Sequence, residues 1–467
     1  MNGRRKIFLL FLILLLIFTK QYVTSWNDAS RIATIESLVD YNSFAIDNSL
    51  FIGTGDKYLY AGNFYSTKPP IFTLLSSGVY LLINSLGFSF QSNYRATYYL
   101  LTILVIGGTS CLGGVYFYKI LQLWQTPILW ANVLLFLVFT GTLILPYSTV
   151  FNNHTVSASL AIASFYYLLK TKDNRKYNIL SAFFLSLAGS IDFALFIFTP
   201  FFLVFLPSKK LRITFVVSCL PVITTYLLLN FHLTGSFIPA VLNSSLYDYP
   251  GSEFKEATTR SSAGFKWNSI LELFQYTFRI SLGNRGLISY SPVLLLSVFA
   301  GIKNYHKKRF PCKKEYLLIF GSVSTYTIFC IFFTSNAGGC SYGIRYLIPT
   351  IFLLYLPLAH LSHDLKKSKV IQILFIIASL ISILVSVVGL IHPYTNFFAD
   401  CNVDNTFITA IKIIWIRGYP NSVLVNIDYS GLKLWYRWGL AIALPLIYFN
   451  FYLLWRKFLA FSQPRKY

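Results

Sequence analysis

Residues 4–31 read RRKIFLLFLILLLIFTKQYVTSWNDASR, and this stretch indicates how the whole chain is organised. Three basic residues begin it, an apolar run extends from about Lys6 to Val23, and Asp28 follows closely. A helix needs about 20 mostly apolar residues to cross a bilayer. We therefore predict a first membrane span that is retained, with a cleaved signal peptide ending near Thr24 as the alternative.

The composition extends this interpretation to all 467 residues. Hydrophobic types make up 55% of the chain and charged types 12%, and the mean hydropathy is +0.59. An ordinary soluble domain has about 25% charged residues, so a soluble enzyme, a disordered protein and a coiled coil are excluded. The six cysteines show no metal-ligand spacing, which argues against a zinc site. We predict an all-α polytopic membrane protein.

Eleven further apolar runs follow the first one, and together they predict a bundle of about 12 transmembrane helices, within a range of 11 to 13. Two neighbouring runs are short and are separated by Asp192, so they are also compatible with two short helices that meet at a turn. The twelve runs lie at about 6–23, 95–118, 127–147, 155–170, 177–190, 193–206, 211–230, 288–302, 315–334, 345–361, 370–391 and 436–455.

The net charge of +23 comes from 39 Lys and Arg against 16 Asp and Glu. In a soluble protein this excess would suggest nucleic acid, but in a membrane protein basic residues collect in cytoplasmic loops. If the apolar run 69–87 lies flat on the outer surface, 24 basic residues fall in cytoplasmic loops and 13 acidic residues fall outside. We therefore predict an interfacial helix at 69–87, cytoplasmic termini and no nucleic-acid partner.

With this topology, the long connecting segments all lie on the outer side of a single domain that covers 1–467. They span about 24–94, 231–287 and 392–435, whereas the cytoplasmic loops are short. Chemistry is therefore expected on the outer face. Cys340 and Cys401 would both face outward, where a disulfide between them is one possibility.

Asp28 and Lys68 are the first candidates for that chemistry. Asn27 or Asp28 can cap a helix that extends to about Val39, with Arg31 one turn further along. The alternative to a catalytic Asp28 is a cap with a surface ion pair to Arg31. Lys68 precedes two prolines at the predicted start of the interfacial helix, where free N–H groups favour an anion. A lysine that snorkels to the lipid headgroups is the alternative there.

Two glycine-containing stretches, 283–292 and 338–346, each lead from the outer side into a predicted span. Their glycines permit tight turns and a close approach to a ligand. Arg285 and Arg345 lie in these stretches, each as an anion ligand or as a headgroup anchor.

Taken in order, these motifs resemble those of the GT-C membrane glycosyltransferases, the group with the protein O-mannosyltransferases and the lipid A aminoarabinose transferases. The match comprises Asp28-Ala29-Ser30-Arg31-Ile32-Ala33 and Tyr65-Ser66-Thr67-Lys68-Pro69-Pro70, and it is clearest over 1–170. The resemblance implies a GT-C-type bundle with interfacial helices in the first long outer loop.

The resemblance also implies an activity. A sugar would pass, with inversion, from a polyprenyl-phosphate-linked donor to a glycan, lipid or protein acceptor, on the extracytoplasmic side of the plasma membrane. Membrane lipids would surround the protein. The implied roles are a base for Asp28 and donor-phosphate binding for Lys68, Arg345 and Arg285.

The chain departs from the family pattern at three places. Ala29 and Thr67 stand where acidic residues are common, and Asn152-Asn153-His154-Thr155 stands where the family often has a second aspartate. Asn153 or His154 would have to replace that aspartate, or Asp192 could take its role, with Arg31 close by. The need for a divalent metal stays open, since a pair of aspartates is the natural hard-cation ligand set.

The sequence leaves open a second function and a second role for two tyrosines. The alternative function is a transporter or flippase of a lipid-linked glycan, which would also need many spans but predicts buried mid-span charges and inverted repeats. The spans are nearly free of charge, Asp192 excepted, and no repeat is evident. In the outer segment 231–287, Tyr247 and Tyr249 could stack on a sugar or belong to an interfacial aromatic belt.

Overall fold

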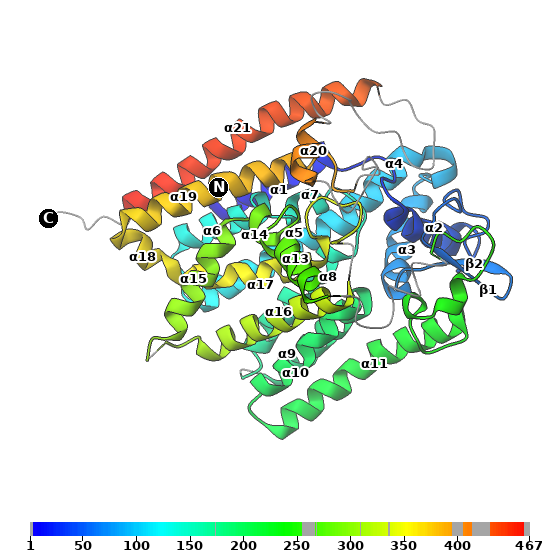
Figure 1. The fold of residues 1–467 in the computed structure, drawn as a ribbon, viewed down its shortest axis with the longest axis horizontal. Helices are drawn as coiled ribbons and strands as arrows, with labels where there is room; N and C mark the ends of the chain where they lie inside the picture. Colours follow the sequence, from blue (N-terminus) through cyan, green and yellow to red (C-terminus); the bar gives the residue numbers. More distant parts are fainter. Residues whose placement is uncertain are drawn as a thin grey trace.

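The computed structural model describes residues 3–172, 174–254, 267, 269–308, 310–334, 337–394, 405–412 and 430–461, the last stretch as backbone alone at 430–437 and 461. The chain is an all-α polytopic membrane protein, in which helices form a bundle and a small hairpin lies at one end (Figure 1). Six helical stretches within these residues are long and apolar enough to cross a membrane: Phe90–Leu123, Lys209–Thr234, Lys313–Phe333, Arg345–Lys367, Lys369–Gly389 and Trp438–Ala460.

The first half of the chain alternates helices of the bundle with the elements of the first long outer loop. Each apolar run predicted in this half contains helix. The elements are α1 Gly3–Phe18, α2 Trp26–Asp40, β1 Lys57–Tyr60, β2 Asn63–Ser66, α3 Pro70–Ser85, α4 Phe90–Thr102, a π-helical turn Ile103–Gly107, α5 Gly108–Leu123, α6 Ile128–Thr140, α7 Ile144–Tyr147, α8 His154–Leu169, α9 Arg175–Ile191, a 3₁₀ turn Phe193–Ile197, α10 Phe198–Phe205 and α11 Lys209–Thr234.

The second half is also helical and carries the remaining predicted runs. Short 3₁₀ stretches interrupt it before and after α17. Its elements are 3₁₀ turns Ala240–Leu242 and Ser244–Tyr247, α13 Ile270–Ser281, α14 Leu287–Tyr290, α15 Val293–Tyr305, α16 Lys313–Phe333, a 3₁₀ segment Arg345–Thr350, α17 Ile351–Tyr355, a 3₁₀ segment Leu356–Leu361, α18 Ser362–Lys367, α19 Lys369–Gly389, α20 Thr406–Lys412 and α21 Ser430–Phe461.

Helix α1 is shorter than the apolar run that predicted it, since it ends at Phe18 rather than near Val23. The backbone N–H of Lys20 donates to the carbonyl of Thr149 at 2.9 Å. The Lys20 ammonium donates to the carbonyl of Leu390 at 2.8 Å. These bonds satisfy polar groups of the chain outside the helix, so the segment after Phe18 is tied to the loops that precede α8 and follow α19.

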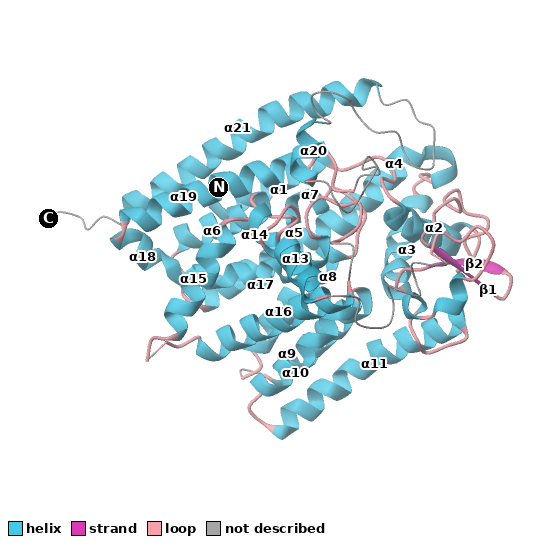
Figure 2. Cartoon of the chain, viewed as in Figure 1, coloured by secondary structure: helices cyan, strands magenta, loops and turns pink. Residues whose placement is uncertain are grey.

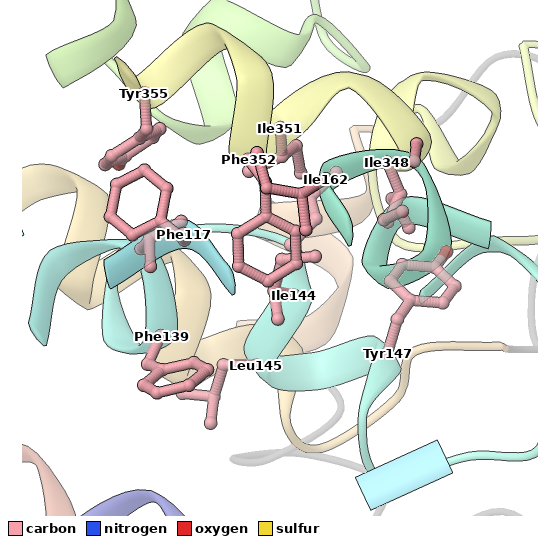
Figure 3. Close-up of a cluster of buried hydrophobic side chains, with 14 of the residues drawn as sticks. Phe117, Phe139, Ile144, Leu145, Tyr147, Ile162, Ile348, Ile351, Phe352 and Tyr355 are labelled. Atoms are coloured by element: carbon pink, nitrogen blue, oxygen red, sulfur yellow. The ribbon is translucent and has the colours of Figure 1, made fainter. Parts of the chain in front are cut away.

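The centre of the bundle is a close-packed apolar cluster (Figure 3). Phe117 of α5 and Phe352 of α17 meet with ring centroids 6.0 Å apart, and Phe139 comes from α6. A side chain at Gly114 would collide with the Phe139 ring, so glycine is needed where α5 and α6 cross. This core packs the helices against one another and so fixes the positions of their ends, where the polar residues of the candidate active site lie.

The hairpin of β1 and β2 was not expected from the sequence. Its strands pair antiparallel, with Tyr60 opposite Asn63 and two turn residues between them. Those two residues, Ala61 and Gly62, have φ of 48° and 84°, as a type I′ turn requires. Alternating aromatic residues on either side of Ala-Gly were the available signal.

Tyr247 and Tyr249, candidates for sugar stacking, instead pack on this hairpin. The Tyr247 ring meets that of Tyr58 at 6.4 Å, and the Tyr249 hydroxyl donates to the carbonyl of Lys57 at 3.2 Å. Both tyrosines are buried. In this arrangement their rings support the outer loop and present no face to a ligand.

Helix α3 confirms the helix predicted at 69–87, and its position at the membrane interface stays a prediction. Pro69 is its N-cap and Pro70 its first residue, where the missing N–H of proline costs nothing. The helix packs against α2, α4, α9 and α11 at the end of the molecule that holds the hairpin (Figure 1). The alternative for 177–206 is also confirmed, because α9 and the helical stretch from Phe193 meet at Asp192.

Candidate active site

The polar residues that the sequence singles out come from the ends of α2, α3, α8 and α9 and from the 3₁₀ segment Arg345–Thr350. Figure 2 places the two strands of the hairpin, and longer loops around them, at this same end of the bundle. Helix α8 packs against both α9 and the segment 345–350, so residues far apart in the chain meet there.

Asp28 lies at the third position of α2 in a capping box. The N-cap is Ser25, rather than Asn27 or Asp28 as expected, and its side chain accepts from the backbone of residue 28. The Asp28 carboxylate accepts six hydrogen bonds, three on each oxygen, and the side chain is fully buried. The donors are N–H and hydroxyl of Thr24 at 2.8 and 3.2 Å, N–H and hydroxyl of Ser25 at 2.7 and 2.8 Å, N–H of Ala29 at 3.2 Å and hydroxyl of Tyr98 at 2.8 Å.

Two opposing effects act on the pKa of Asp28. Burial raises the pKa above the usual aspartate value, because the charged form loses its hydration. The hydrogen bonds from Thr24, Ser25 and Tyr98 lower it, and burial prevails. The carboxyl group is thus held at the N-terminus of α2, and its acceptor sites are already used.

Arg31 connects α2 to α8. One guanidinium nitrogen donates to the backbone carbonyl and the side-chain oxygen of Asn27. The other donates to Oδ1 of Asn153 at 2.7 Å. The surface ion pair with Asp28, the plainer expectation, does not form within the described part of the chain.

Lys68 is paired with Asp56, which the sequence analysis did not single out. Lys68 Nζ lies 2.5 Å from Asp56 Oδ2, and both side chains are 14% exposed. Ser30 of α2 holds the two ends of the hairpin in register for this pair, since its hydroxyl donates to the Asp56 carbonyl and bonds Ser66 Oγ, both at 2.6 Å. Asp56 belongs to no sequence motif, so only the closed hairpin identifies it as the partner of Lys68.

The pKa of Lys68 falls to about 8. Burial is the largest cause, Asp56 opposes it, and the nearby cations Arg31 and Arg345 lower the pKa further. Because Arg31 and Arg345 both act on the pKa of Lys68, these three cations lie near one another although they come from separate elements.

His154 and Asp192 form a second pair. His154 is the first residue of α8, Asp192 follows α9, and Nδ1 lies 2.9 Å from Oδ2. An ionised carboxylate can only accept, so Nδ1–H donates, and in the neutral imidazole Nε2 keeps a free lone pair. Within the described residues Nε2 has no hydrogen-bond partner. Asn153 donates to the Ile191 carbonyl at 3.2 Å, which ties the same two helices together.

Arg345 lies between two aromatic rings. The centre of its guanidinium lies 5.4 Å from the centroid of Tyr346 and 5.4 Å from that of Tyr394. Its Nε atom is buried and has no hydrogen-bond partner among the described residues. Gly338 and Gly343 of the preceding loop have φ of 96° and 65°, which agrees with the tight turns expected from the glycines.

Arg285 takes a different place from the other candidates. It is fully buried, and its guanidinium donates to the carbonyls of Gly339 and Ser341 at 2.6 and 3.0 Å. These carbonyls belong to the loop that precedes Arg345, so Arg285 positions that loop from behind.

The structure therefore brings Asp28, Arg31, Lys68, Asn153, His154, Asp192 and Arg345 to one region and adds Asp56 and Tyr394. Tyr394 interacts electrostatically with Arg345, Arg31 and Asp28. No group of three His, Cys, Asp or Glu side chains suited to a metal forms within the described ranges. Cys340 is disulfide-bonded, and Cys401, which the sequence left as one possible partner, lies outside the described residues.

No protein-family model matches this chain, and no curated protein is similar to it in sequence. Among solved structures it is similar to ArnT from Cupriavidus metallidurans bound to undecaprenyl phosphate, with a TM-score of 0.55 and 10% identity over 96% of this chain and 75% of that one. Apo ArnT gives a TM-score of 0.55 and 11% identity over 97% and 75%.

A weaker likeness is to an Archaeoglobus fulgidus oligosaccharyltransferase in complex with Zn and sulfate, with a TM-score of 0.42 and 13% identity over 86% of this chain and 52% of that one. This TM-score is too low to indicate a shared fold. The two ArnT structures show that the chain has the ArnT fold, which agrees with the fold that the sequence motifs imply.

Proposed function

We propose that this chain, which has the ArnT fold, is a membrane glycosyltransferase that transfers a sugar from a polyprenyl-phosphate-linked donor to an acceptor at the extracytoplasmic face. The observation that carries the proposal is the convergence of Arg31, Lys68 and Arg345 from three separate elements. A structure with this fold has been obtained with undecaprenyl phosphate bound, which supports a lipid phosphate as the ligand.

The three cations suit a leaving phosphate. Lys68 has three donors, so it can keep Asp56 and still donate to a phosphate oxygen. The buried Nε of Arg345 offers a further donor without a partner in the described chain. Charge-assisted bonds of this kind stabilise negative charge where it develops on the departing phosphate.

The reaction we propose is a single displacement with inversion. A base removes the proton of the acceptor hydroxyl, and the acceptor oxygen bonds to the anomeric carbon on the face opposite the phosphate. The bond between that carbon and the phosphate oxygen breaks, and its electron pair leaves with the phosphate. The cation cluster holds the donor in line with the acceptor.

Two groups are candidates for the base. Asp28 is the residue that the family motif indicates, but to act it must exchange one of six hydrogen bonds for the acceptor hydroxyl. His154 keeps Nε2 free while Asp192 orients its ring, an arrangement that suits proton removal. We favour His154 as the base, with Asp28 as the residue that holds the start of α2.

The side of the membrane follows from the charge distribution. The cation cluster lies beyond the C-terminal end of α1, whereas Arg4, Arg5 and Lys6 lie at its N-terminal end. Basic residues in short loops favour the cytoplasm, so the cluster falls on the extracytoplasmic side.

The test is transfer by the purified full-length protein supplied with a panel of polyprenyl-phosphate sugars, with and without divalent cations and chelator. We expect one donor to be consumed and to release the polyprenyl phosphate, and we expect Lys68→Gln and Arg345→Gln to slow this release at donor concentrations below KM. If no donor is consumed, but labelled donor crosses the bilayer of proteoliposomes, the chain is a transporter of the lipid-linked sugar and the proposal fails.

A further inference from the structure

A cavity of about 400 Å³ lies at the opposite end of the bundle from the cation cluster. It is lined by α1 and α5, near the start of α1. Arg4, Arg5 and Phe8 line it from α1, and Val115, Tyr118 and Lys119 line it from α5. Three of the six lining residues are cations, and none is acidic.

Two of the three cations of this cavity, Arg4 and Lys119, lie against aromatic rings, and neither forms an ion pair with a carboxylate among the described residues. The guanidinium of Arg4 lies 5.1 Å from the centroid of Tyr118, and the ammonium of Lys119 lies 5.1 Å from that of Tyr116 and 5.5 Å from that of Tyr166. A ring face attracts a cation but does not neutralise it. The cavity therefore keeps its positive charge and suits an anion.

Helix α1 is about 24 Å long at the usual rise per residue, so the cavity at its start is far from the cluster beyond its end. Helix α1 and the helical stretch Phe90–Leu123 run side by side over this length. The Tyr99 hydroxyl donates to the Leu16 carbonyl at 2.7 Å near one end, and Arg4 covers Tyr118 at the other. The cavity thus opens into a long seam between α1 and the stretch Phe90–Leu123.

Apolar side chains flank this seam on both helices. Leu9, Leu12 and Leu16 follow Arg5 at spacings that place them on one face of α1, and all three are exposed. Leu104 and Leu112 are exposed on the neighbouring stretch. A free phosphate would use only the cavity, whereas a lipid with an anionic headgroup would use both the cavity and the seam.

We propose that the cavity and its seam bind one anionic phospholipid, such as phosphatidylglycerol, with the phosphate among Arg4, Arg5 and Lys119 and an acyl chain along the leucines. Basic pockets between transmembrane helices are suited to anionic headgroups. The proposal is independent of the transferase activity, because it concerns the other end of the bundle.

The test is native mass spectrometry of the full-length protein titrated with equal amounts of phosphatidylglycerol and phosphatidylcholine of the same chain length. We expect about a tenfold preference for phosphatidylglycerol, given that each basic residue near a lipid surface adds several-fold to binding. The variant Arg4→Gln/Arg5→Gln/Lys119→Gln should lose the preference. Arg5→Gln/Lys119→Gln, which leaves the Arg4–Tyr118 contact in place, should reduce it without disturbing the fold.

The matched control is Lys366→Gln/Lys367→Gln/Lys369→Gln, which removes the same charge from an exposed stretch outside the cavity. It should keep the preference. Equal losses in the control and the cavity variant would overturn the proposal in favour of general surface charge. Equal binding of glycerol-1-phosphate would overturn the role of the seam. Displacement by equimolar undecaprenyl phosphate would assign the site to the lipid carrier instead.

Discussion

His154 Nδ1 lies 2.9 Å from Asp192 Oδ2, although 38 residues separate the two in the chain. His154 begins α8 and Asp192 follows α9, so the packing of these two helices sets the distance. The family motif leads one to expect a carboxylate here, and the chain provides an imidazole with a carboxylate behind it. This pair gives a reason to look for the base outside Asp28.

We expect His154→Gln to reduce the rate of sugar transfer by about 100- to 10,000-fold, the usual contribution of a general base. Asp192→Asn should reduce it less, since the imidazole remains and loses only its orientation. The measurement is single-turnover transfer across a pH series, in which the acidic limb of the profile should vanish with His154→Gln. A His154→Gln variant that keeps the wild-type limb would remove His154 from the chemistry.

Asp28 and Ser25 form one capping box, so variants at both separate capping from catalysis. We expect Ser25→Ala and Asp28→Asn each to lower the free energy of unfolding by about 1 kcal/mol. If Asp28 only holds α2, transfer falls to a similar extent in both variants. A loss of transfer in Asp28→Asn alone, at matched thermal stability, would return the role of base to Asp28.

Lys68 should make donor binding sensitive to alkaline pH. Its pKa of about 8 in the donor-free protein lies below the usual lysine value, chiefly because it is buried. The Lys68 side chain is therefore mostly charged below pH 8 and loses its charge as the pH rises through 8. The affinity for the donor should fall over the same pH range. In Lys68→Arg the charge persists, and this alkaline loss should disappear in a titration with donor.

The exposed Lys209 supplies the control for that titration. Lys209→Arg should leave the alkaline loss unchanged, because Lys209 begins α11 and is not part of the cation cluster. An alkaline loss that survives in Lys68→Arg would show that another group governs donor affinity.

Arg345 and Arg285 should differ in how they affect the donor. We expect Arg345→Gln to raise the apparent KM for the donor by about tenfold or more, since it removes a charge-assisted bond of about 1.5–3 kcal/mol. Arg285→Gln removes the guanidinium donor from the carbonyls of Gly339 and Ser341, so thermal stability should fall together with activity. An unchanged KM in Arg345→Gln would exclude it as a donor ligand.

Glu36 should make the stability of the outer loop depend on pH. Burial raises its pKa from 4.5 to about 7, although hydrogen bonds from Ser49, Leu50 and Gln91 oppose this. The unfolded chain ionises near 4.5 and the folded chain near 7, so this group destabilises the fold progressively as pH rises between the two values. Glu36→Gln should flatten the melting temperature over that interval, and an unaltered slope would contradict the assignment.

The sequence by itself determined the elements that local physics controls. Runs of apolar residues located the spans, because a lipid environment demands helices with satisfied backbones. Two prolines located the start of α3, and the order of the motifs indicated the residues of the cluster. Asp28, Lys68 and Arg345 could be named in this way, as each adjoins the end of a predicted span or interfacial helix.

The partners of these residues were decided only by the tertiary structure. Asp56 reaches Lys68 because a hairpin closes between them, Asp192 reaches His154 because α8 packs on α9, and Arg285 lies behind its loop because Gly339 and Ser341 accept its bonds. Periodicity describes which face of a helix is apolar, but it does not specify which helix covers that face. That choice depends on side chains far apart in the chain, whose close packing sets the distances within the cluster.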